Sequence, residues 1–320
     1  MPLGRKHSPG GFEALSAKQT CLDRVVVVTG AGRGIGRAHA LALAAEGARV
    51  VVNDLGVEID GRGASTAPAE EVVSEIAAKG GEAIAVATDV ATTEGANDLI
   101  EAGVERFGRV DAVINNAGID RPGMLIDLST EDWDAVIDVH LKAQFLVLRA
   151  AGRHWRERSL RGENVRAALV NTSSPAALVG FRGEGAYSAG KAGVLALTLT
   201  AADELAAYGV TVNAVVPGAA TRLTAWSPGA PGPESVAPLI VWLASLDASD
   251  VTGRIFSAAG GIFMLLHGWE SGAPVLLGEG GIEKLAAELR ERLAAERAPG
   301  EVLAPGRNLA PRPGAPGNLG

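Results

Sequence analysis

The sequence has very little cysteine and lacks any long apolar run. Its one cysteine, Cys21, has no second thiol for an internal disulfide or for a cysteine-based metal site, which favours a reducing compartment. No apolar run reaches the roughly 18–20 residues of a membrane-spanning helix. The first 20 residues also lack the apolar stretch of a secretory signal peptide. We therefore expect a cytoplasmic protein.

Positive charge and aromatic residues are also scarce. Aromatic residues make up 4% of the chain, and the formal net charge is −8 at neutral pH. No stripe of Lys and Arg with interleaved aromatic residues is visible, so we expect neither nucleic acid nor a membrane surface as a partner. The histidines His39 and His154 have no neighbours at metal-ligand spacing, and we expect no metal. A small molecule is the expected partner.

Apolar, β-branched runs alternate with longer stretches of helical period from residue 24 onward. These runs cover residues 25–29, 49–53, 83–88, 110–114, 168–171, 210–215 and 254–257. Continuous apolar runs, such as the four valines at 25–28, are typical of strands covered on both faces. Strands that alternate with helices predict an α/β fold, with a doubly wound parallel sheet and right-handed crossovers.

The chain divides into three parts by composition. Residues 1–20 are polar and predict a flexible leader, residues 21–270 one globular domain, and residues 271–320 an extension. Within the domain, the apolar run 236–246 predicts a buried helix. Within the extension, residues 281–298 have apolar residues at helical spacing, and residues 299–320 are rich in Pro and Gly, which predicts a helix and a disordered end.

A glycine-rich segment, TGAGRGIG (29–36), follows the first predicted strand and precedes a predicted helix. Glycines allow a tight turn and a close approach of backbone N–H groups to a pyrophosphate, which the helix N-terminus also attracts. The residues that we expect at this phosphate site are Gly30, Arg33, Gly34, Ile35 and Gly36. The strand and the helix around the segment make the signal strong.

An acidic residue, Asp54, lies 18 positions after Gly36 at the end of the second predicted strand. A carboxylate there can accept hydrogen bonds from the adenosine ribose hydroxyls and would repel a 2′-phosphate, so we predict NAD rather than NADP. Arg33 is close enough in sequence to complicate this choice. The alternative for Asp54 is a turn-forming role before Leu55 and Gly56.

Two further strand ends supply candidate cofactor contacts. Asp89 and Val90 end the third predicted strand, where an acceptor could reach the adenine amino group. Asn116, Ala117 and Gly118 end the fourth, where small residues would let the cofactor cross. Turn formation explains each of these signals equally well.

Tyr187 and Lys191 are four residues apart at the start of a helical stretch, which places both side chains on one face. A free tyrosine has a pKa near ~10, and a neighbouring ammonium group favours the phenolate. Tyr187 could then act as a base toward an alcohol or as an acid toward a ketone, while Lys191 could also hold the nicotinamide ribose. Ser174, 13 residues before Tyr187, could orient the substrate oxygen.

These residues resemble the short-chain dehydrogenase/reductase family. The matching segments are TGAGRGIG (29–36), NNAG (115–118), NTSS (171–174), YSAGK (187–191) and VNAVVPGAATRL (212–223). The resemblance implies a Rossmann sheet of seven parallel strands, catalytic roles for Ser174, Tyr187 and Lys191, and contacts of Pro217, Gly218 and Thr221 with the nicotinamide carboxamide. It also implies a homodimer or homotetramer built by helices that include the one carrying Tyr187.

A narrower resemblance is to the (3R)-hydroxyacyl-CoA dehydrogenase module of the peroxisomal multifunctional enzymes and its bacterial relatives. It rests on VVNDLG (51–56), VHLKAQF (139–145) and VAPLIVWL (236–243). Most of the family has Asn where this chain has His140, and that Asn supports a proton relay to the lysine. His140 could take part in the relay or could be a hydrogen-bonded structural residue. Trp226 follows the segment where the family places its substrate lid.

The expected function is NAD-dependent interconversion of a secondary alcohol and a ketone, with a 3-hydroxyacyl-CoA as a candidate substrate. A steroid or another alicyclic alcohol is the alternative substrate class. An alternative of another kind is a non-catalytic NAD-binding sensor. The presence of Ser174, Tyr187 and Lys191 argues against the sensor, which needs no activated phenol.

Overall fold

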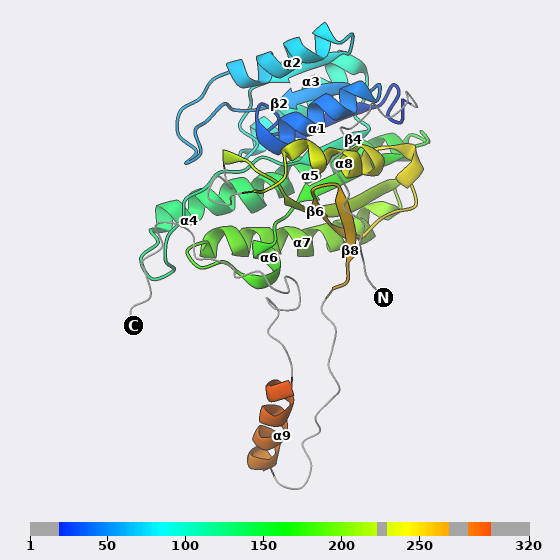
Figure 1. The fold of residues 1–320 in the computed structure, drawn as a ribbon. Coiled ribbons are helices and arrows are strands. Elements are labelled where there is room, and N and C mark those ends of the chain that lie inside the picture. The colour runs from blue at the N-terminus through cyan, green and yellow to red at the C-terminus, as the bar shows by residue number, and fades with distance from the viewer. Residues whose placement is uncertain (1–18, 223–228, 269–280, 296–320) are drawn as a thin grey trace, which may run out of the picture.

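The computed structural model of the chain describes residues 19–222, 229–268 and 281–295. A single sheet has the strand order β3-β2-β1-β4-β5-β6-β7-β8 and lies between helices (Figure 1). The strands are β1 (Val25–Thr29), β2 (Arg49–Asn53), β3 (Ala83–Val86), β4 (Ala112–Asn115), β5 (Ala167–Thr172), β6 (Val210–Gly218), β7 (Ile255–Ala259) and β8 (Ile262–Leu266). The α/β, doubly wound class is confirmed.

Helices connect the parallel strands and cover both faces of the sheet. They are α1 (Gly34–Ala45), α2 (Ala67–Ala78), α3 (Thr93–Phe107), α4 (Thr130–Ile137), the π-helical turn η1 (Asp138–Lys142), α5 (Ala143–Leu160), α6 (Ala176–Val179), α7 (Gly185–Ala206), the 3-10 turn η3 (Pro233–Ser235), α8 (Ala237–Ala244), the 3-10 turn η4 (Leu246–Ala248) and α9 (Gly281–Ala295). Within the described residues, no helix is both long and apolar enough to span a bilayer.

The valines of β1 show why this sheet is covered on both sides. Val26 and Val28 pack into one apolar core with residues of α1, α2 and α8. Val25 and Val27 pack into a second core with residues of α3, α5 and α7. Because successive side chains of a strand point to opposite faces, an unbroken apolar run supplies both cores at once.

The number of strands corrects one expectation. Strands β1 to β7 are parallel as the resemblance implied, but β8 adds an eighth strand, antiparallel to β7. The turn between them is Gly260–Gly261, with φ of 59° and 76°. Two successive residues with positive φ make the two-residue hairpin turn that matches strand twist, and glycine adopts them without strain. The glycine pair between two apolar runs was the signal for this hairpin.

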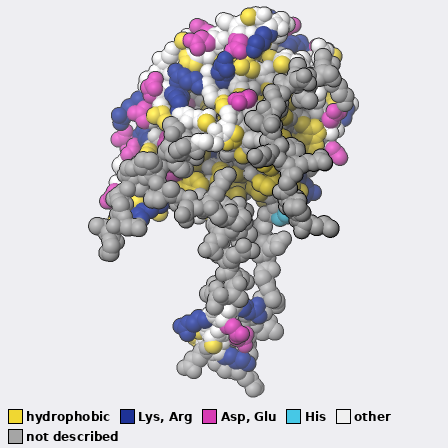
Figure 2. All heavy atoms as spheres, in the orientation of Figure 1, with side chains coloured by type: hydrophobic (Ala, Val, Ile, Leu, Met, Phe, Trp, Pro, Cys, Tyr) yellow, Lys and Arg dark blue, Asp and Glu magenta, His cyan; other side chains and the backbone are white. Residues whose placement is uncertain are grey.

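Strand β8 differs from the other strands in its exposure. Ile262, Phe263, Met264 and Leu265 are 64%, 42%, 54% and 46% exposed. On the face shown in Figure 2, charges of both signs are interspersed over the upper part of the body, and apolar side chains gather toward its lower edge. The described part of the chain thus leaves an apolar sheet edge uncovered.

Other expected boundaries shift by a few residues. Strand β3 ends at Val86 rather than at residue 88, and β4 begins at Ala112 rather than at residue 110. Helix α8 occupies Ala237–Ala244 within the expected helix 236–246, and α9 occupies Gly281–Ala295 within the expected helix 281–298. The expected leader, apart from residues 19–20, and the segment 299–320 lie outside the described residues.

Candidate active site

The glycine-rich turn lies between β1 and α1, at the carboxyl end of the sheet. Strand β1 is flanked by β2 and β4, so the strand order reverses direction there, which is where doubly wound sheets bind ligands. Gly30 has a φ of 61°, and a Cβ on it would lie 2.7 Å from Ala117 Cα. A Cβ on Gly36 would lie 2.1 Å from the Gly30 carbonyl oxygen. The turn therefore requires bare backbone, as a cradle for phosphate does.

Asp54 is held at the rim of this turn, one residue beyond β2. Its Oδ2 accepts a hydrogen bond from Gly32 N at 2.7 Å, and its Oδ1 accepts one from Gly56 N at 2.7 Å. The Arg33 guanidinium donates to the Val57 carbonyl oxygen at 3.1 Å, so it is directed to the loop after β2. The expected acidic residue and the expected arginine thus lie side by side at the glycine turn.

The end of β4 is attached to the same turn through its side chains. Thr29 Oγ1 accepts hydrogen bonds from Asn116 N and Ala117 N at 2.9 and 3.1 Å. The Asn116 amide donates to the carbonyl oxygens of Thr29 and Gly30 at 3.1 and 3.2 Å. Asn116 therefore holds the glycine-rich turn in place. Ala117 and Gly118 follow it in the chain, and Ala117 lies against Gly30.

The remaining expected cofactor contacts fall at the ends of neighbouring strands. Asp89 Oδ1 accepts from Ala91 N at 2.9 Å, which is the turn-forming role left open above, and Val90 is buried. Pro217 and Gly218 end β6, paired in register with β7. Thr221 lies near Gly34, because a Cβ there would lie 3.6 Å from Thr221 Cγ2. Partly buried Ile35 packs on the core below α1.

Helix α7 brings Tyr187 and Lys191 together, as their spacing predicted. The Lys191 Nζ lies 5.9 Å from the centroid of the Tyr187 ring and donates to the Thr172 carbonyl oxygen at 2.7 Å. Lys191 is 2% exposed, and burial lowers its pKa to about 7. Within the described residues, no carboxylate forms an ion pair with it. The amine can therefore gain or lose a proton near neutral pH.

The end of β5 supplies two serines with different contacts. Ser174, the expected residue, accepts a hydrogen bond from Ala176 N at 3.2 Å through its Oγ. Ser173, which the sequence reasoning did not select, donates from its Oγ to the Lys191 carbonyl oxygen at 2.8 Å. Ser173 thereby fastens α7 to the strand that precedes Ser174, and the repeated serine in NTSS was its signal.

His140 lies in the middle of the π-helical turn η1, and its imidazole stands edge-on to Tyr187. The two ring centroids are 4.8 Å apart, with an interplanar angle of 82°. The Nε2 lies 2.6 Å from the Ile119 carbonyl oxygen and 3.2 Å from the Ile119 backbone N, so the tautomer decides whether it donates to the first or accepts from the second. Burial, and then the charge of Lys191, lower the pKa of His140 to about 3. The imidazole is therefore neutral, and its Nδ1 is buried with no hydrogen-bond partner.

A chain of buried amides lies behind these residues and was missed from the sequence. Asn115 Nδ2 donates to Asn171 Oδ1 at 3.0 Å, and Asn171 Nδ2 donates to Thr198 Oγ1 at 2.9 Å. Gln144 Nε2 donates to the Thr172 carbonyl oxygen at 3.1 Å, the same oxygen that accepts from Lys191. Amides inside otherwise apolar runs were the available signal, because buried polar groups need partners.

Comparison with known proteins agrees with this arrangement. The family model for short chain dehydrogenases matches residues 24–227. The chain belongs to the short-chain dehydrogenase family. A short-chain dehydrogenase of this kind is an oxidoreductase that acts on CH–OH groups, and the family normally binds a nicotinamide dinucleotide.

Three relatives show how near the likeness is. The hydroxyacyl-CoA dehydrogenase ChsB1 of Mycobacterium tuberculosis is 44% identical over 254 residues, covering 74% of this chain and 77% of that protein. The mouse peroxisomal multifunctional enzyme type 2 is 39% identical over 252 residues, covering 77% of this chain but 33% of that longer enzyme. A crystal structure of a short chain dehydrogenase from Mycobacterium avium is 48% identical, with a TM-score of 0.79, and covers 87% of this chain and 97% of the other. The narrower resemblance to hydroxyacyl-CoA dehydrogenases is thereby confirmed.

One residue expected near the substrate, Trp226, lies outside the described residues. The segment before it is described as far as Arg222, whose guanidinium lies 3.8 Å from Glu58 in the loop after β2. This ion pair joins the segment after β6 to the β2–α2 loop.

Proposed function

We propose that this chain is an NAD-dependent dehydrogenase that interconverts a secondary alcohol and a ketone, with 3-hydroxyacyl-CoA thioesters as its substrate class. The observation on which the proposal rests is the buried Lys191 amine beside the Tyr187 ring. A bound nicotinamide dinucleotide supplies the hydride acceptor. The bare glycine turn and the carboxylate at its rim suit such a group, because a Cβ at Gly30 or Gly36 would collide with backbone.

Proton transfer is the task of Tyr187. During alcohol oxidation its phenolate removes the hydroxyl proton, and during ketone reduction its phenol returns one. A protonated Lys191 amine favours the phenolate form of its neighbour. The Thr172 carbonyl oxygen accepts a hydrogen bond from that amine, and Gln144 donates to the same oxygen and so helps to hold it in place.

Ser174 and His140 have supporting roles in this proposal. Ser174 accepts a backbone N–H through Oγ, so its hydroxyl proton can point to the substrate oxygen. His140 packs edge-on against Tyr187 and limits where the phenol can lie. Its neutral imidazole adds no competing positive charge beside Lys191.

Asp54 supports NAD over NADP. Two backbone N–H groups fix its carboxylate at the rim of the glycine turn, where it can accept from ribose hydroxyls and repel a 2′-phosphate. The thioester class comes from the relatives, one of which is named a hydroxyacyl-CoA dehydrogenase.

The proposal also concerns binding partners. We expect the chain to form a homodimer or homotetramer and to bind a small alcohol or ketone, and we expect it to bind neither nucleic acid nor a membrane. Exposed apolar side chains on the helices beside the site support self-association: Phe145 of α5 is 41% exposed, and Leu199 of α7 is 50% exposed. Equilibrium sedimentation measures the subunit number, and a monomer at micromolar concentration would contradict this part.

The decisive assay follows reduction of NAD and of NADP by the full chain with hydroxyacyl-CoA thioesters of both configurations, steroids and simple secondary alcohols. We expect the highest kcat/KM for NAD with a hydroxyacyl-CoA. Tyr187→Phe should abolish turnover and leave NADH binding nearly unchanged. Preference for a steroid would overturn the substrate class, and full activity of Tyr187→Phe would overturn the mechanism. Binding of NADH without turnover of any alcohol would favour the sensor.

A further inference from the structure

An arginine stands at or just before the amino end of five parallel strands. These residues are Arg24 before β1, Arg49 at the start of β2, Arg109 before β4, Arg166 before β5 and Arg254 before β7. Because parallel strands begin at the same edge of a sheet, the five side chains gather at the edge opposite the candidate active site. The chain as a whole has a net charge of −8, so a concentration of positive charge at this edge is unlike the rest of the protein.

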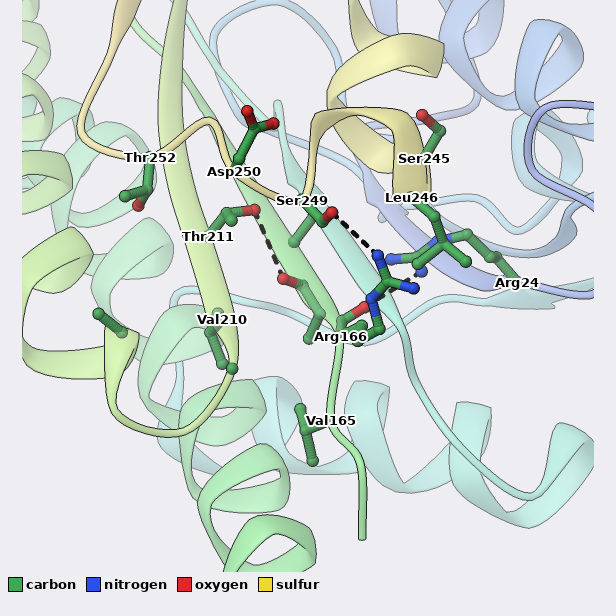
Figure 3. A pocket seen from close by; sticks show the side chains of 14 residues that line it. Arg24, Val165, Arg166, Val210, Thr211, Ser245, Leu246, Ser249, Asp250 and Thr252 are labelled. Carbon is green, nitrogen blue, oxygen red and sulfur yellow. Dashed lines mark hydrogen bonds between the residues drawn. The ribbon is translucent and has the colours of Figure 1, made fainter.

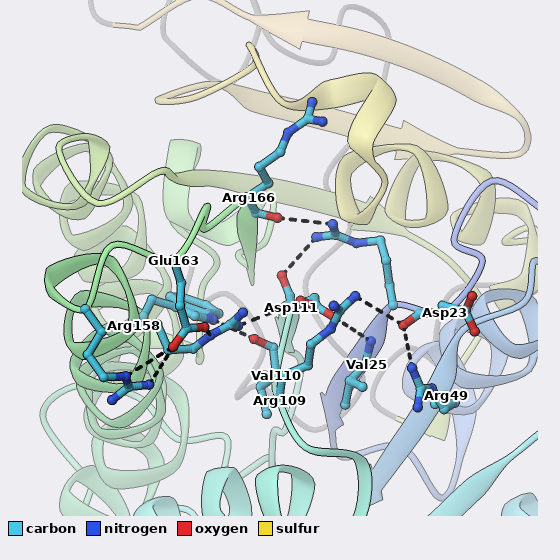
Figure 4. Close-up of polar contacts among 12 residues, drawn as sticks. Asp23, Val25, Arg49, Arg109, Val110, Asp111, Arg158, Glu163 and Arg166 are labelled. Carbon is cyan, nitrogen blue, oxygen red and sulfur yellow. Dashed lines mark hydrogen bonds and ion pairs between the residues drawn. The ribbon is translucent and has the colours of Figure 1, made fainter.

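Carboxylates neutralise only some of the positive charge at this edge. Figure 4 shows the polar contacts around one of them, Asp111. Arg109 pairs with Asp111 at 2.8 Å. Nearby, Arg158 and Arg161 share Glu163. The described part of the chain offers no ion pair to Arg24, Arg49, Arg166 or Arg254.

Arg24 is the most deeply placed of these cations. It is 5% exposed, and its guanidinium donates to the Arg166 and Asp111 carbonyl oxygens at 3.1 and 2.9 Å. Burial lowers the pKa of Arg24, while the charge of Asp111 opposes this effect. An arginine nevertheless stays protonated in proteins, so a full positive charge lies beneath this edge.

A hollow of about 350 Å³ opens beside Arg24. Its walls come from the amino ends of β5 and β6, the turn after α7 and the residues after α8. Figure 3 shows Arg166 crossing the hollow, where its guanidinium donates to Ser249 Oγ at 3.0 Å. The carboxylate of Asp250, which also lines the hollow, points away from both guanidinium groups in that view.

The hollow has the size and the mixed lining of a small-molecule site. Ligand pockets commonly measure about 300–1,000 Å³ and combine an apolar wall with a few polar groups. The apolar wall here comes from Val165, Val210 and Leu246, and hydroxyl groups come from Thr211 and Ser245. The positive charge, the volume and the lining residues of the hollow therefore all favour an anionic ligand with an apolar part.

We propose that this hollow binds the phosphate monoester of a small molecule. The phosphate lies between the guanidinium groups of Arg24 and Arg166 and accepts from the Ser249 hydroxyl, while the organic part lies against Val165 and Leu246. Two guanidinium groups suit a dianionic phosphate better than a singly charged carboxylate. The site lies at the opposite edge of the sheet from the dinucleotide cradle, so the two ligands can bind together.

Phenyl phosphate is a suitable probe, because it joins a phosphate to an apolar ring. Calorimetric titration of the full chain, with the nucleotide site saturated by a nicotinamide dinucleotide and the ionic strength held constant, measures its affinity for this edge. We expect Arg166→Gln to weaken binding by about tenfold or more, because a charge-assisted contact is lost. Arg153→Gln, which removes an exposed arginine of α5 that does not line the hollow, should leave the affinity unchanged.

Two further measurements complete the test. The conservative variant Arg166→Lys controls for misfolding, and benzoate distinguishes a carboxylate ligand from a phosphate ligand. Arg166→Lys keeps the charge but loses the two-pronged donor, so its affinity should fall between those of the wild type and of Arg166→Gln. Benzoate should bind more weakly than phenyl phosphate. Absence of phenyl phosphate binding, equal affinity in Arg166→Gln, or equal affinity for benzoate would each overturn the proposal. None of these outcomes bears on dehydrogenase activity, which is measured separately.

Discussion

The two edges of the sheet each hold a buried cation, and the two cations behave differently. Lys191 at the carboxyl edge is 2% exposed, and Arg24 at the amino edge is 5% exposed. Both donate to backbone carbonyl oxygens, and neither has an ion pair in the described part of the chain. Burial brings the pKa of Lys191 to about 7, whereas an arginine keeps its charge.

This difference shows that burial alone does not decide what a cation can do. An amine in such surroundings exchanges protons near neutral pH and can serve a proton-transfer reaction. A guanidinium in similar surroundings supplies a constant charge, which serves structure and anion binding. Substitutions at the two edges should therefore separate turnover from stability.

The largest contrast is expected from Lys191→Met and Arg24→Met. Lys191→Met should lower kcat by about 10²–10⁴-fold, because the neighbour that favours the Tyr187 phenolate is lost. Arg24→Met should leave kcat per folded molecule unchanged, and Lys79→Met, at the residue that follows α2, is the matched control for loss of a lysine. Steady-state kinetics with protein of known folded fraction measures both variants. A similar loss of kcat in Lys191→Met and Arg24→Met would show that the two buried cations do not differ in their effect on turnover.

The difference in stability between the wild type and Lys191→Met should also depend on pH. The folded-state pKa of about 7 lies below the ordinary lysine value, so the buried charge destabilises the fold fully below pH 7. This cost diminishes as pH rises from 7 toward the unfolded-state pKa, by about 1.4 kcal/mol per pH unit. Urea unfolding of the wild type and of Lys191→Met between pH 6 and 10 should show the wild type gaining relative stability. A constant difference would show that Lys191 titrates normally.

A second carboxyl-edge substitution, Asp54→Asn, should change cofactor choice rather than chemistry. Loss of the negative charge should lower the ratio of kcat/KM for NAD to that for NADP by about 10–100-fold, the range expected for one charged hydrogen bond. Asp60→Asn, in the exposed loop that follows, should keep the original ratio. An unchanged ratio in Asp54→Asn would assign NAD selection to another residue.

At the amino edge, Arg24→Met should lower the free energy of unfolding by about 1–3 kcal/mol, because two backbone carbonyl groups each lose a hydrogen bond from the charged guanidinium. Those carbonyls belong to Arg166 and Asp111, which precede neighbouring strands. Arg153→Met, at an exposed site of α5, should cost much less. Denaturant unfolding at pH 7 measures both variants, and equal stabilities would mean that water replaces the guanidinium.

A separate effect, confined to acid pH, is expected from the buried histidines. His39 and His140 are each 1% exposed, and burial lowers both pKa values to about 3. Both are neutral in the folded protein, so stability should fall as pH drops from about 6.5 toward 3, where the unfolded chain binds protons first. His39→Leu and His140→Leu should each flatten this slope. Only His140→Leu should also lower kcat, by about tenfold, because it positions Tyr187.

Much of the candidate site could be predicted because its chemistry is local in the chain. The glycine turn 29–36 requires residues without a Cβ, and Tyr187 and Lys191 share a helix face through their spacing alone. Asp54 was found from its distance to that turn. The two-residue hairpin at Gly260–Gly261 had an equally local signal, but it was not used, and the eighth strand was missed.

Other features depend on contacts between distant segments. Ser173 contacts the Lys191 backbone from the end of β5, and Gln144 at the start of α5 shares the Thr172 carbonyl oxygen with the Lys191 amine. The π-helical turn that places His140 against Tyr187 contains no glycine or proline that would have indicated it. The arginine-lined edge likewise arises only when five strand starts are brought into line.

The sequence by itself therefore determined the fold class, the glycine-rich turn and the tyrosine–lysine pair, because apolar period, bare glycine and helix spacing act over a few residues. Only the tertiary structure decided which cations are buried, and hence which one titrates near pH 7. Desolvation depends on everything packed around a group, and most of that packing comes from residues far away in the chain.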